Sequence, residues 1–274
     1  MIKHILPLVN SIQHKVYVET FGGGGVVLFT KRPVALEVFN DINSGLYNFM
    51  YVLSKPKLFK RFQRRIEVLP YSWELYFDAW DTWKDETDKV ERAVKWFIMI
   101  RQGFSGKLDR SWSFSVSGKS IATKNWMSAI DRLPEYAMRM RGVQVENRDW
   151  RIIHDRYDSP NTLFYLDPPY VHETRRSGGY DDEMNNKEHE DLIENLLTLQ
   201  GNVVLSGYQH PIYKPLEDAG WVRQDHVILC KAAGGMKAAG LQGKGAIKAA
   251  GQTRVECLWI KPCKLGEGLF ETNI

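Results

Sequence analysis

The stretch LFYLDPPY, residues 163–170, joins a hydrophobic strand to an acid, two prolines and an aromatic residue. Proline has no N–H to donate to a sheet, so the strand has to end at Asp167 and the chain has to turn outwards there. Ligands of open α/β sheets bind at the carboxyl ends of the strands. The stretch therefore predicts an α/β fold with a functional loop formed by Asp167, Pro168, Pro169 and Tyr170.

Strand-like and helical segments alternate on both sides of this stretch, which indicates a mostly parallel α/β sheet with helices on both faces. Strands are expected at 16–19, 34–39, 143–146, 163–166, 203–205, 227–229 and 255–260, and helices at 1–13, 43–54 and 187–199. Between about 55 and 142 the pattern is helical and holds six of the nine tryptophans, for which core packing is favoured over base stacking. Residues 1–54 and 143–274 are therefore expected to form one α/β domain, interrupted by a helical insert at 55–142.

The composition excludes several classes of protein. The chain has 274 residues, of which 43% are hydrophobic, so general disorder is excluded. The three cysteines show no CxxC spacing and the histidines no HxxxH spacing, so we expect neither a disulfide framework nor a metal site. No apolar run is long enough for a membrane span, and a reducing cytoplasm is the expected location.

Charge is distributed unevenly along the chain. The net charge is only +4, but residues 55–65 carry six basic and no acidic side chains, and residues 151–200 have a net charge of −6. A single charged run is usually a solvated surface, whereas several basic segments around an acidic centre favour a polyanion as partner. A basic Lys-Ala-Ala-Gly repeat within 231–251 is typical of a mobile loop, or of a loop that settles onto a phosphate backbone.

A glycine run follows the first expected strand, in VYVETFGGGG at 16–25. A glycine turn at this place lets backbone N–H groups approach a ligand closely. The next strand ends at Asn40 and Asp41, and an acid at the tip of the second strand commonly accepts hydrogen bonds from ribose hydroxyls. Asp41 suits the N-cap of the following helix equally well.

The tetrapeptide Asp167 to Tyr170 suits an exocyclic amino group on a base. Such a nitrogen is a poor nucleophile because its lone pair is delocalised into the ring. A carboxylate and a backbone carbonyl held by proline can accept both of its N–H bonds and direct the lone pair at an electrophile. An aromatic side chain can stack on a base, provided the base has left the duplex.

The FGGGG segment, the acid in NDIN at 40–43 and the DPPY loop together resemble the N6-adenine DNA methyltransferases of the Dam type. The order of the motifs is similar to the alpha arrangement, in which the insert is the target-recognition domain, and several segments resemble methylases of phages and prophages. The resemblance implies a Rossmann-like class I methyltransferase sheet, S-adenosylmethionine as methyl donor with S-adenosylhomocysteine as product, and no metal. It also implies double-stranded DNA as partner, with no membrane and no obligatory protein partner. No nuclease motif is present, so a restriction partner would be a separate protein, and the expected location is the cytoplasm of a bacterial or phage-infected cell.

The resemblance also implies roles for individual residues. Asp167 to Tyr170 would form the catalytic loop, and Asp41 would bind the ribose. The other residues expected around the cofactor are Glu19, Phe21, Gly22, Gly23, Gly24, Asn147, Asp149 and Asp167, with Asp149 equally suited to capping the next helix. The side chains expected to contact DNA are basic, and they are Lys57, Lys60, Arg61, Arg64, Arg65, Arg110, Lys119, Arg175 and Arg176.

One departure leaves alternatives open. Members of this family usually have a PGGK or AGGK segment before the first strand, and its lysine would fall at or just before Met1. The expectation is weaker cofactor binding unless Lys3 or another chain substitutes. The alternatives are a DNA-binding protein with an impaired methyltransferase fold, or an amino methyltransferase with another target base.

Overall fold

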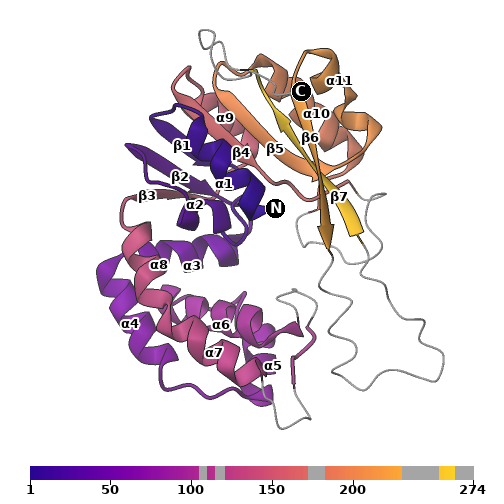
Figure 1. Ribbon diagram of the computed structural model, residues 1–274. Helices are drawn as coiled ribbons and strands as arrows, with labels where there is room; N and C mark the ends of the chain where they lie inside the picture. Colours follow the sequence, from indigo (N-terminus) through magenta and orange to yellow (C-terminus); the bar gives the residue numbers. More distant parts are fainter. Residues whose placement is uncertain (105–109, 115–120, 172–182, 230–252, 263–274) are drawn as a thin grey trace, which may run out of the picture.

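The computed structural model describes residues 1–104, 110–114, 121–171, 183–229 and 253–262, and its centre is a seven-stranded sheet (Figure 1). The strand order is β3-β2-β1-β4-β5-β7-β6, in which β1 to β5 are parallel and β7 is antiparallel to both of its neighbours. The strands are β1 (Val16–Glu19), β2 (Leu36–Asn40), β3 (Val143–Glu146), β4 (Thr162–Leu166), β5 (Asn202–Tyr208), β6 (Val222–Leu229) and β7 (Thr253–Ile260).

Helices join the strands. Those of the α/β part are α1 (Ile2–Ser11), α2 (Val26–Thr30), α3 (Ser44–Ser54), α9 (Trp150–Tyr157), α10 (Asn186–Thr198), the short 3₁₀ helix η3 (Pro211–Tyr213) and α11 (Lys214–Asp218). Between α3 and β3 lie α4 (Pro56–Ile66), α5 (Trp73–Thr82), α6 (Lys89–Gln102), α7 (Ile121–Asp131) and α8 (Leu133–Met140). Within the described ranges, no helix is long and apolar enough to cross a membrane.

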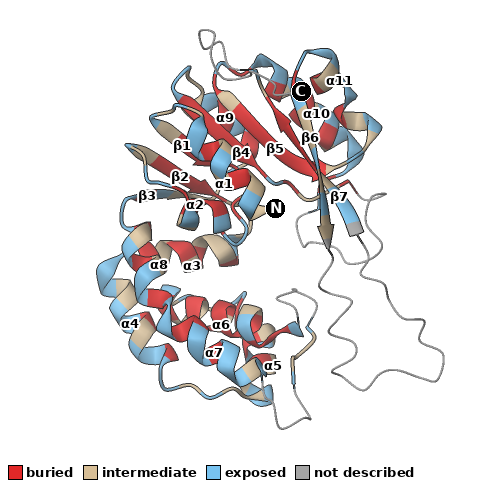
Figure 2. Ribbon diagram, viewed as in Figure 1, coloured by how far each residue is buried: buried red, intermediate tan, exposed pale blue. Residues whose placement is uncertain are grey.

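Alternate residues of the strands pack against helices on opposite faces of the sheet, because successive side chains of a strand point to opposite sides. On one face Tyr17 belongs to a core that includes residues of α1, α2 and α3, while on the other face Val18 packs with residues of α9, α10 and α11. Buried positions cover the central strands almost completely (Figure 2). The predicted α/β class with helices on both faces is confirmed.

The helical segment between α3 and β3 packs on the sheet domain through α3, which contacts both α6 and α8. The contact is close, since a Cβ on Gly45 of α3 would lie 2.3 Å from the Trp96 ring. Trp83, Trp96 and Trp126 are buried, as expected of core residues, whereas Trp73 is 53% exposed. The segment thus has the predicted helical character, and its boundaries at 55 and 142 as a separate domain stay a prediction.

Several strand boundaries differ from the prediction: β5 runs on to Tyr208, past the predicted end at 205, and β7 begins at Thr253, before the predicted start at 255. Strand β2 begins at Leu36 and not at Val34, and it extends to Asn40. Strand β6 begins at Val222, five residues before the predicted start at Val227. The first half of β6 is polar, and β6 is the edge strand of the sheet, where polar residues are tolerated; the hydrophobic pattern therefore did not reveal it.

A buried group of three charges joins α8 to the sheet. The Glu37 carboxylate of β2 is 3% exposed and forms an ion pair with Lys31, which is also buried. Arg139 of α8 binds the same carboxylate, at 2.5 Å from Nη1 to Oε2, and donates from Nη2 to the Leu28 carbonyl at 2.9 Å. These ionic hydrogen bonds keep the pKa of Glu37 below its usual value despite its burial.

We expect the substitution Glu37→Gln to lower the free energy of unfolding by about 3 kcal/mol or more, because it leaves two cations with no compensating charge in the interior. Urea denaturation measures the change. Lys214→Ala is the control, since Lys214 pairs with Asp218 on the surface and its loss should cost less than about 1 kcal/mol. Equal effects of the two substitutions would contradict the account of this group.

Candidate functional site

The carboxyl ends of the five parallel strands meet at one edge of the sheet. Glu19 ends β1, and the segments that follow β1, β2, β3 and β4 contain Thr20 to Gly25, Asp41, Asn147 to Asp149 and Asp167 to Tyr170, respectively. The structure therefore brings the predicted catalytic and cofactor residues to one edge, although the sequence spreads them from Glu19 to Tyr170.

The side chain of Asn40 ties three of these segments together. Its Nδ2 donates to the Thr20 carbonyl at 2.9 Å and to the Arg148 carbonyl at 3.0 Å. Its Oδ1 accepts from the Arg148 N–H at 3.0 Å. Asn40 is only 2% exposed, so its own amide group would be left without partners in the interior if these bonds were lost. The sequence reasoning assigned no role to Asn40.

The glycine turn after β1 has the conformation that only glycine adopts readily. Gly23 and Gly25 have positive φ angles of 48° and 63°, and the Gly22 N–H donates to the Asn40 carbonyl at 2.8 Å. A Cβ on Gly22 would lie 2.2 Å from the Phe39 ring, whereas a Cβ on Gly24 would have no neighbour nearer than 3.7 Å. Gly22 is therefore required by packing, and Gly24 leaves backbone open for the approach of a ligand.

Asp41 bridges the glycine turn and the helix that follows β2. Its Oδ2 accepts from the Gly23 N–H at 2.9 Å, and its Oδ1 accepts from the Asn43 N–H at 2.8 Å. The N-cap of α3 is Asn43, whose side chain accepts from Gly45 and Leu46, so the alternative of Asp41 as N-cap was wrong. Asp41 therefore fixes the glycine turn relative to the start of α3.

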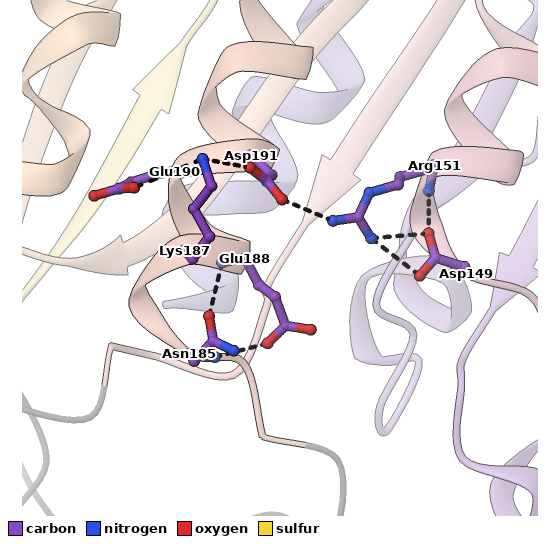
Figure 3. A network of polar contacts seen from close by, with 7 residues as sticks. All are labelled: Asp149, Arg151, Asn185, Lys187, Glu188, Glu190 and Asp191. Carbon is purple, nitrogen blue, oxygen red and sulfur yellow. Dashed lines mark hydrogen bonds and ion pairs between the residues drawn. The ribbon is translucent and has the colours of Figure 1, made fainter.

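Asn147 and Asp149 have local structural partners. Asn147 Nδ2 donates to the Asp41 carbonyl at 2.7 Å and to the Ile42 carbonyl at 2.8 Å, which fixes the backbone beside Asp41. Asp149 is the N-cap of α9, as the alternative interpretation expected. Its carboxylate also pairs with Arg151, which reaches on to Asp191 of α10 (Figure 3). The capping box of Asn185 and Glu188 lies beside these ion pairs, at the start of the same helix α10.

Glu19 is the last residue of β1, just before the glycine turn, and is 2% exposed. Its burial raises the pKa to about 8, the Leu28 backbone lowers it, and the negative charge of Asp167 raises it further. Its Oε2 atom has no hydrogen-bond partner. Phe21 follows in the turn and packs partly buried against the core on the α9 side of the sheet. A buried carboxyl group with an unsatisfied oxygen suits a ligand that brings a donor or a positive charge.

Asp167 is exposed to solvent as a residue, but protein groups lie close to its carboxyl group. The resulting desolvation raises its pKa to about 6, although hydrogen bonds from Tyr170 and Ser206 favour the ionised form, and the nearby Glu256 carboxylate raises the pKa as well. The Tyr170 ring meets the Tyr208 ring edge-on, with 4.5 Å between centroids. The carboxylate, its two hydroxyl partners and the two aromatic rings form one cluster.

Three members of this cluster were not predicted from the sequence. Ser206 and Tyr208 lie at the end of β5, and Glu256 of β7 is opposite Tyr208 in the strand register. The antiparallel direction of β7, which brings Glu256 to the carboxyl edge, has no local signal in the sequence.

A buried histidine supports the segment after β1. His154 of α9 is completely buried, and its Nδ1 lies 2.6 Å from Asn195 Oδ1 while its Nε2 lies 3.2 Å from Thr20 Oγ1. Because Asn195 Oδ1 only accepts, Nδ1 carries the proton and Nε2 accepts from the Thr20 hydroxyl. Burial lowers the His154 pKa to about 4, so the ring is neutral.

The predicted DNA-binding residues are not all together. Five of them lie on α4, at the left of the helical segment in Figure 1: Lys57, Lys60, Arg61, Arg64 and Arg65. Arg61 and Arg65 form exposed ion pairs with Asp88 and Glu91 of the α6 region, each at 3.0 Å. Arg110 pairs with Asp81 at 2.6 Å. Lys119, Arg175 and Arg176, like the Lys-Ala-Ala-Gly repeat, lie outside the described residues.

The described ranges contain no cluster of three or more His, Cys, Asp or Glu side chains placed to hold a metal ion. The donor set at the sheet edge consists of backbone N–H groups, carboxyl groups and aromatic rings. Such a set suits an organic ligand with a cationic part and a base.

We expect His154 to make stability depend on pH. Its pKa falls from 6.5 to about 4 on folding, so the unfolded chain binds more protons between these values. The stabilisation is fully present above pH 6.5 and is lost as the pH falls to about 4, by up to about 3 kcal/mol. Urea denaturation at several pH values should show this slope in the native protein and a shallower slope in His154→Gln. Parallel stability curves of the two proteins would refute the assignment.

Comparison with known proteins adds one match. The family model of D12 class N6 adenine-specific DNA methyltransferases matches residues 1–227, which run from α1 into β6 and include both the glycine turn and the DPPY loop. No curated protein matches the chain.

Proposed function

Because the chain belongs to the D12 class N6 adenine-specific DNA methyltransferase family, it is an adenine-specific DNA methyltransferase, and we propose how its site works. S-adenosylmethionine binds over the glycine turn as methyl donor, and an adenine lifted out of the duplex binds at Asp167 to Tyr170. The observation that carries the proposal is the convergence of the glycine turn, Asp41 and Asp167 at one sheet edge.

The residues present fit this cofactor. The exposed backbone of Gly23 and Gly24 gives a ligand close access, and the Asp41 carboxylate beside the turn is placed where ribose hydroxyls would meet it. The buried Glu19 carboxyl group has an oxygen without a partner, and Asp167 has no ion pair among the described residues. Acids without cation partners complement the ammonium and sulfonium of S-adenosylmethionine. When bound, the cofactor supplies an activated methyl group on sulfur.

The chain's own contribution to the reaction is alignment. The Asp167 carboxylate and the Pro168 carbonyl accept the two N–H bonds of the adenine amino group, so its lone pair points at the methyl carbon. Tyr170 offers a ring face to the base, and its own position is supported by Tyr208. In this arrangement the methyl group would pass from the cofactor sulfur to N6, with the carbon–sulfur bond breaking as the carbon–nitrogen bond forms, and N6 would then release one proton. The base has to leave the helix because N6 cannot be reached in the stack.

We propose 55–142 as the part that recognises the DNA target, with 1–54 and 143–274 as the catalytic domain. The exposed basic residues on α4 suit contacts to DNA phosphates. Arg61 and Arg65 can exchange their exposed ion pairs with Asp88 and Glu91 for phosphate groups. Exposed Trp73 and Phe114 on the same part are available to the nucleic acid. With DNA as substrate, the reaction takes place where the DNA is, the cytoplasm of a bacterial or phage-infected cell.

The central experiment is incubation of the protein with S-adenosylmethionine and unmethylated DNA, followed by mass spectrometry of the nucleosides. N6-methyladenine is expected. Asp167→Ala should slow its formation by about a hundredfold or more, since the amino group loses its acceptor. Asp218→Asn, on the surface of α11, is the control and should keep the native rate. N4-methylcytosine as product would overturn the target base, and no product at any protein concentration would favour a DNA-binding protein without activity.

The glycine turn gives a matched pair of variants. Gly22→Ala should raise the dissociation constant for S-adenosylmethionine by about tenfold or more, because the methyl group meets the Phe39 ring and displaces the turn. Gly24→Ala adds a methyl group where no atom lies nearer than 3.7 Å, and should change the constant less. Isothermal titration calorimetry measures both. A larger effect at Gly24 would mean that direct contact, and not the packing of Gly22, governs binding.

A further inference from the structure

Glu256 is the acidic residue of β7 at the catalytic edge, beyond the 1–227 range that the family model matches. In the strand register it lies between Tyr208 of β5 and His226 of β6. Side chains two residues apart on a strand share a face, so Ser206, Tyr208 and Glu256 are on the same face of the sheet. Ser206 is also a hydrogen-bond partner of Asp167.

The strand order separates the two halves of the site. The glycine turn and Asp41 follow β1 and β2, on one side of β4, whereas Tyr208 and Glu256 belong to β5 and β7, on the other side. Asp167, at the end of β4, lies between the two halves. With the cofactor over β1 and β2, the target adenine has to reach Asp167 from the side of β5 and β7. Glu256 is therefore on the side of the base.

Several groups surround the Glu256 side chain. It is half-buried, burial raises its pKa, and the Met1 amino group and Arg254 lower it. His226 is its cross-strand neighbour on β6 and is stacked on His4 of α1, with 4.0 Å between ring centroids. The Glu256 carboxylate interacts through its charge with Asp167, Tyr165 and Tyr170. Tyr208 is its cross-strand neighbour on β5. Within the described chain, Glu256 forms no ion pair.

We propose that Glu256 is a positioning residue for methyl transfer: it stands beside Asp167 on the side of the target base and keeps the Asp167 carboxylate able to take up the proton that N6 releases. This inference rests on the proposed function. After transfer, the nitrogen carries the methyl group, two hydrogens and a positive charge. One N–H bond breaks, its proton passes to an Asp167 oxygen, and the neutral N6-methyladenine leaves before the proton passes to water. A second negative carboxylate nearby stabilises both the charged nitrogen and the protonated Asp167.

The direct test is the titration of Asp167 in the free protein, followed by carbon-detected NMR of labelled aspartate carboxyl groups and assigned with Asp167→Asn. Glu256→Gln keeps the shape of the side chain and removes its charge, so the Asp167 pKa should fall by about half a unit or more. Asp225→Asn is the matched control, because Asp225 of β6 is opposite Cys257 and so lies on the other face of the sheet. Asp225→Asn should leave the Asp167 pKa unchanged, and so should His226→Gln. An unshifted titration in Glu256→Gln overturns the proposal.

The second measurement is the pH profile of a single turnover at saturating S-adenosylmethionine. In Glu256→Gln the acid limb should move to lower pH by a similar amount, and the plateau rate should fall about fivefold or more. A variant with an unchanged plateau but weaker S-adenosylmethionine binding would place Glu256 in the cofactor pocket and overturn the proposal. Absence of methylation by the native protein would refute the proposed function instead, and the NMR titration would still decide whether Glu256 acts on Asp167.

Discussion

The site depends on the buried amide of Asn40, which satisfies backbone groups from the segments after β1 and β3 at the same time. Parallel strands do not share hairpin turns, so the segments at their carboxyl ends need a separate constraint to stay in register. Asn40, at the tip of β2, supplies this constraint: its amide donates one hydrogen bond to each segment and accepts one from the segment after β3. The Asp41 carboxylate next to it then holds the glycine turn through Gly23. The segments after β1, β2 and β3, which we propose as the cofactor site, are thus fixed before any ligand binds, and this reduces the entropy that binding has to overcome.

Electrostatics divides the acids of the sheet domain into two kinds. Glu37 has two cations, Lys31 and Arg139, and stays ionised in the interior as a link between α8 and the sheet. Glu19 and Asp167 lack such partners in the described structure, and their pKa values are raised to about 8 and about 6. A positively charged ligand would lower both values again and would be bound more tightly for that reason. The acidic centre that the sequence showed therefore suits the cofactor, and the basic residues that suit DNA lie elsewhere.

The sequence predicted the parts of the site that carry strong local signals. The glycine turn and the strand that ends before Asp167 are marked by glycine and proline, whose backbone properties differ from those of other residues. The hydrophobic pattern predicted the ends of α10 to within one residue. Long-range partners gave no such signal. The role of Asn40, the burial of Lys31 and the approach of Glu256 all depend on which strands are neighbours, and the polar first half of β6 hid an edge strand. The ion pairs of Arg61 and Arg65 with Asp88 and Glu91 likewise depend on which helices pack together, so the sequence did not reveal them.

The most direct test of the whole account is a crystal structure of the protein with S-adenosylhomocysteine and a DNA duplex that contains the target adenine. We predict the cofactor product over the glycine turn with its ribose at Asp41, and the adenine outside the duplex with its amino group at Asp167, on the side of Tyr208. An adenine that stays stacked in the duplex, or a cofactor product bound on the side of β5 and β7, would contradict the account.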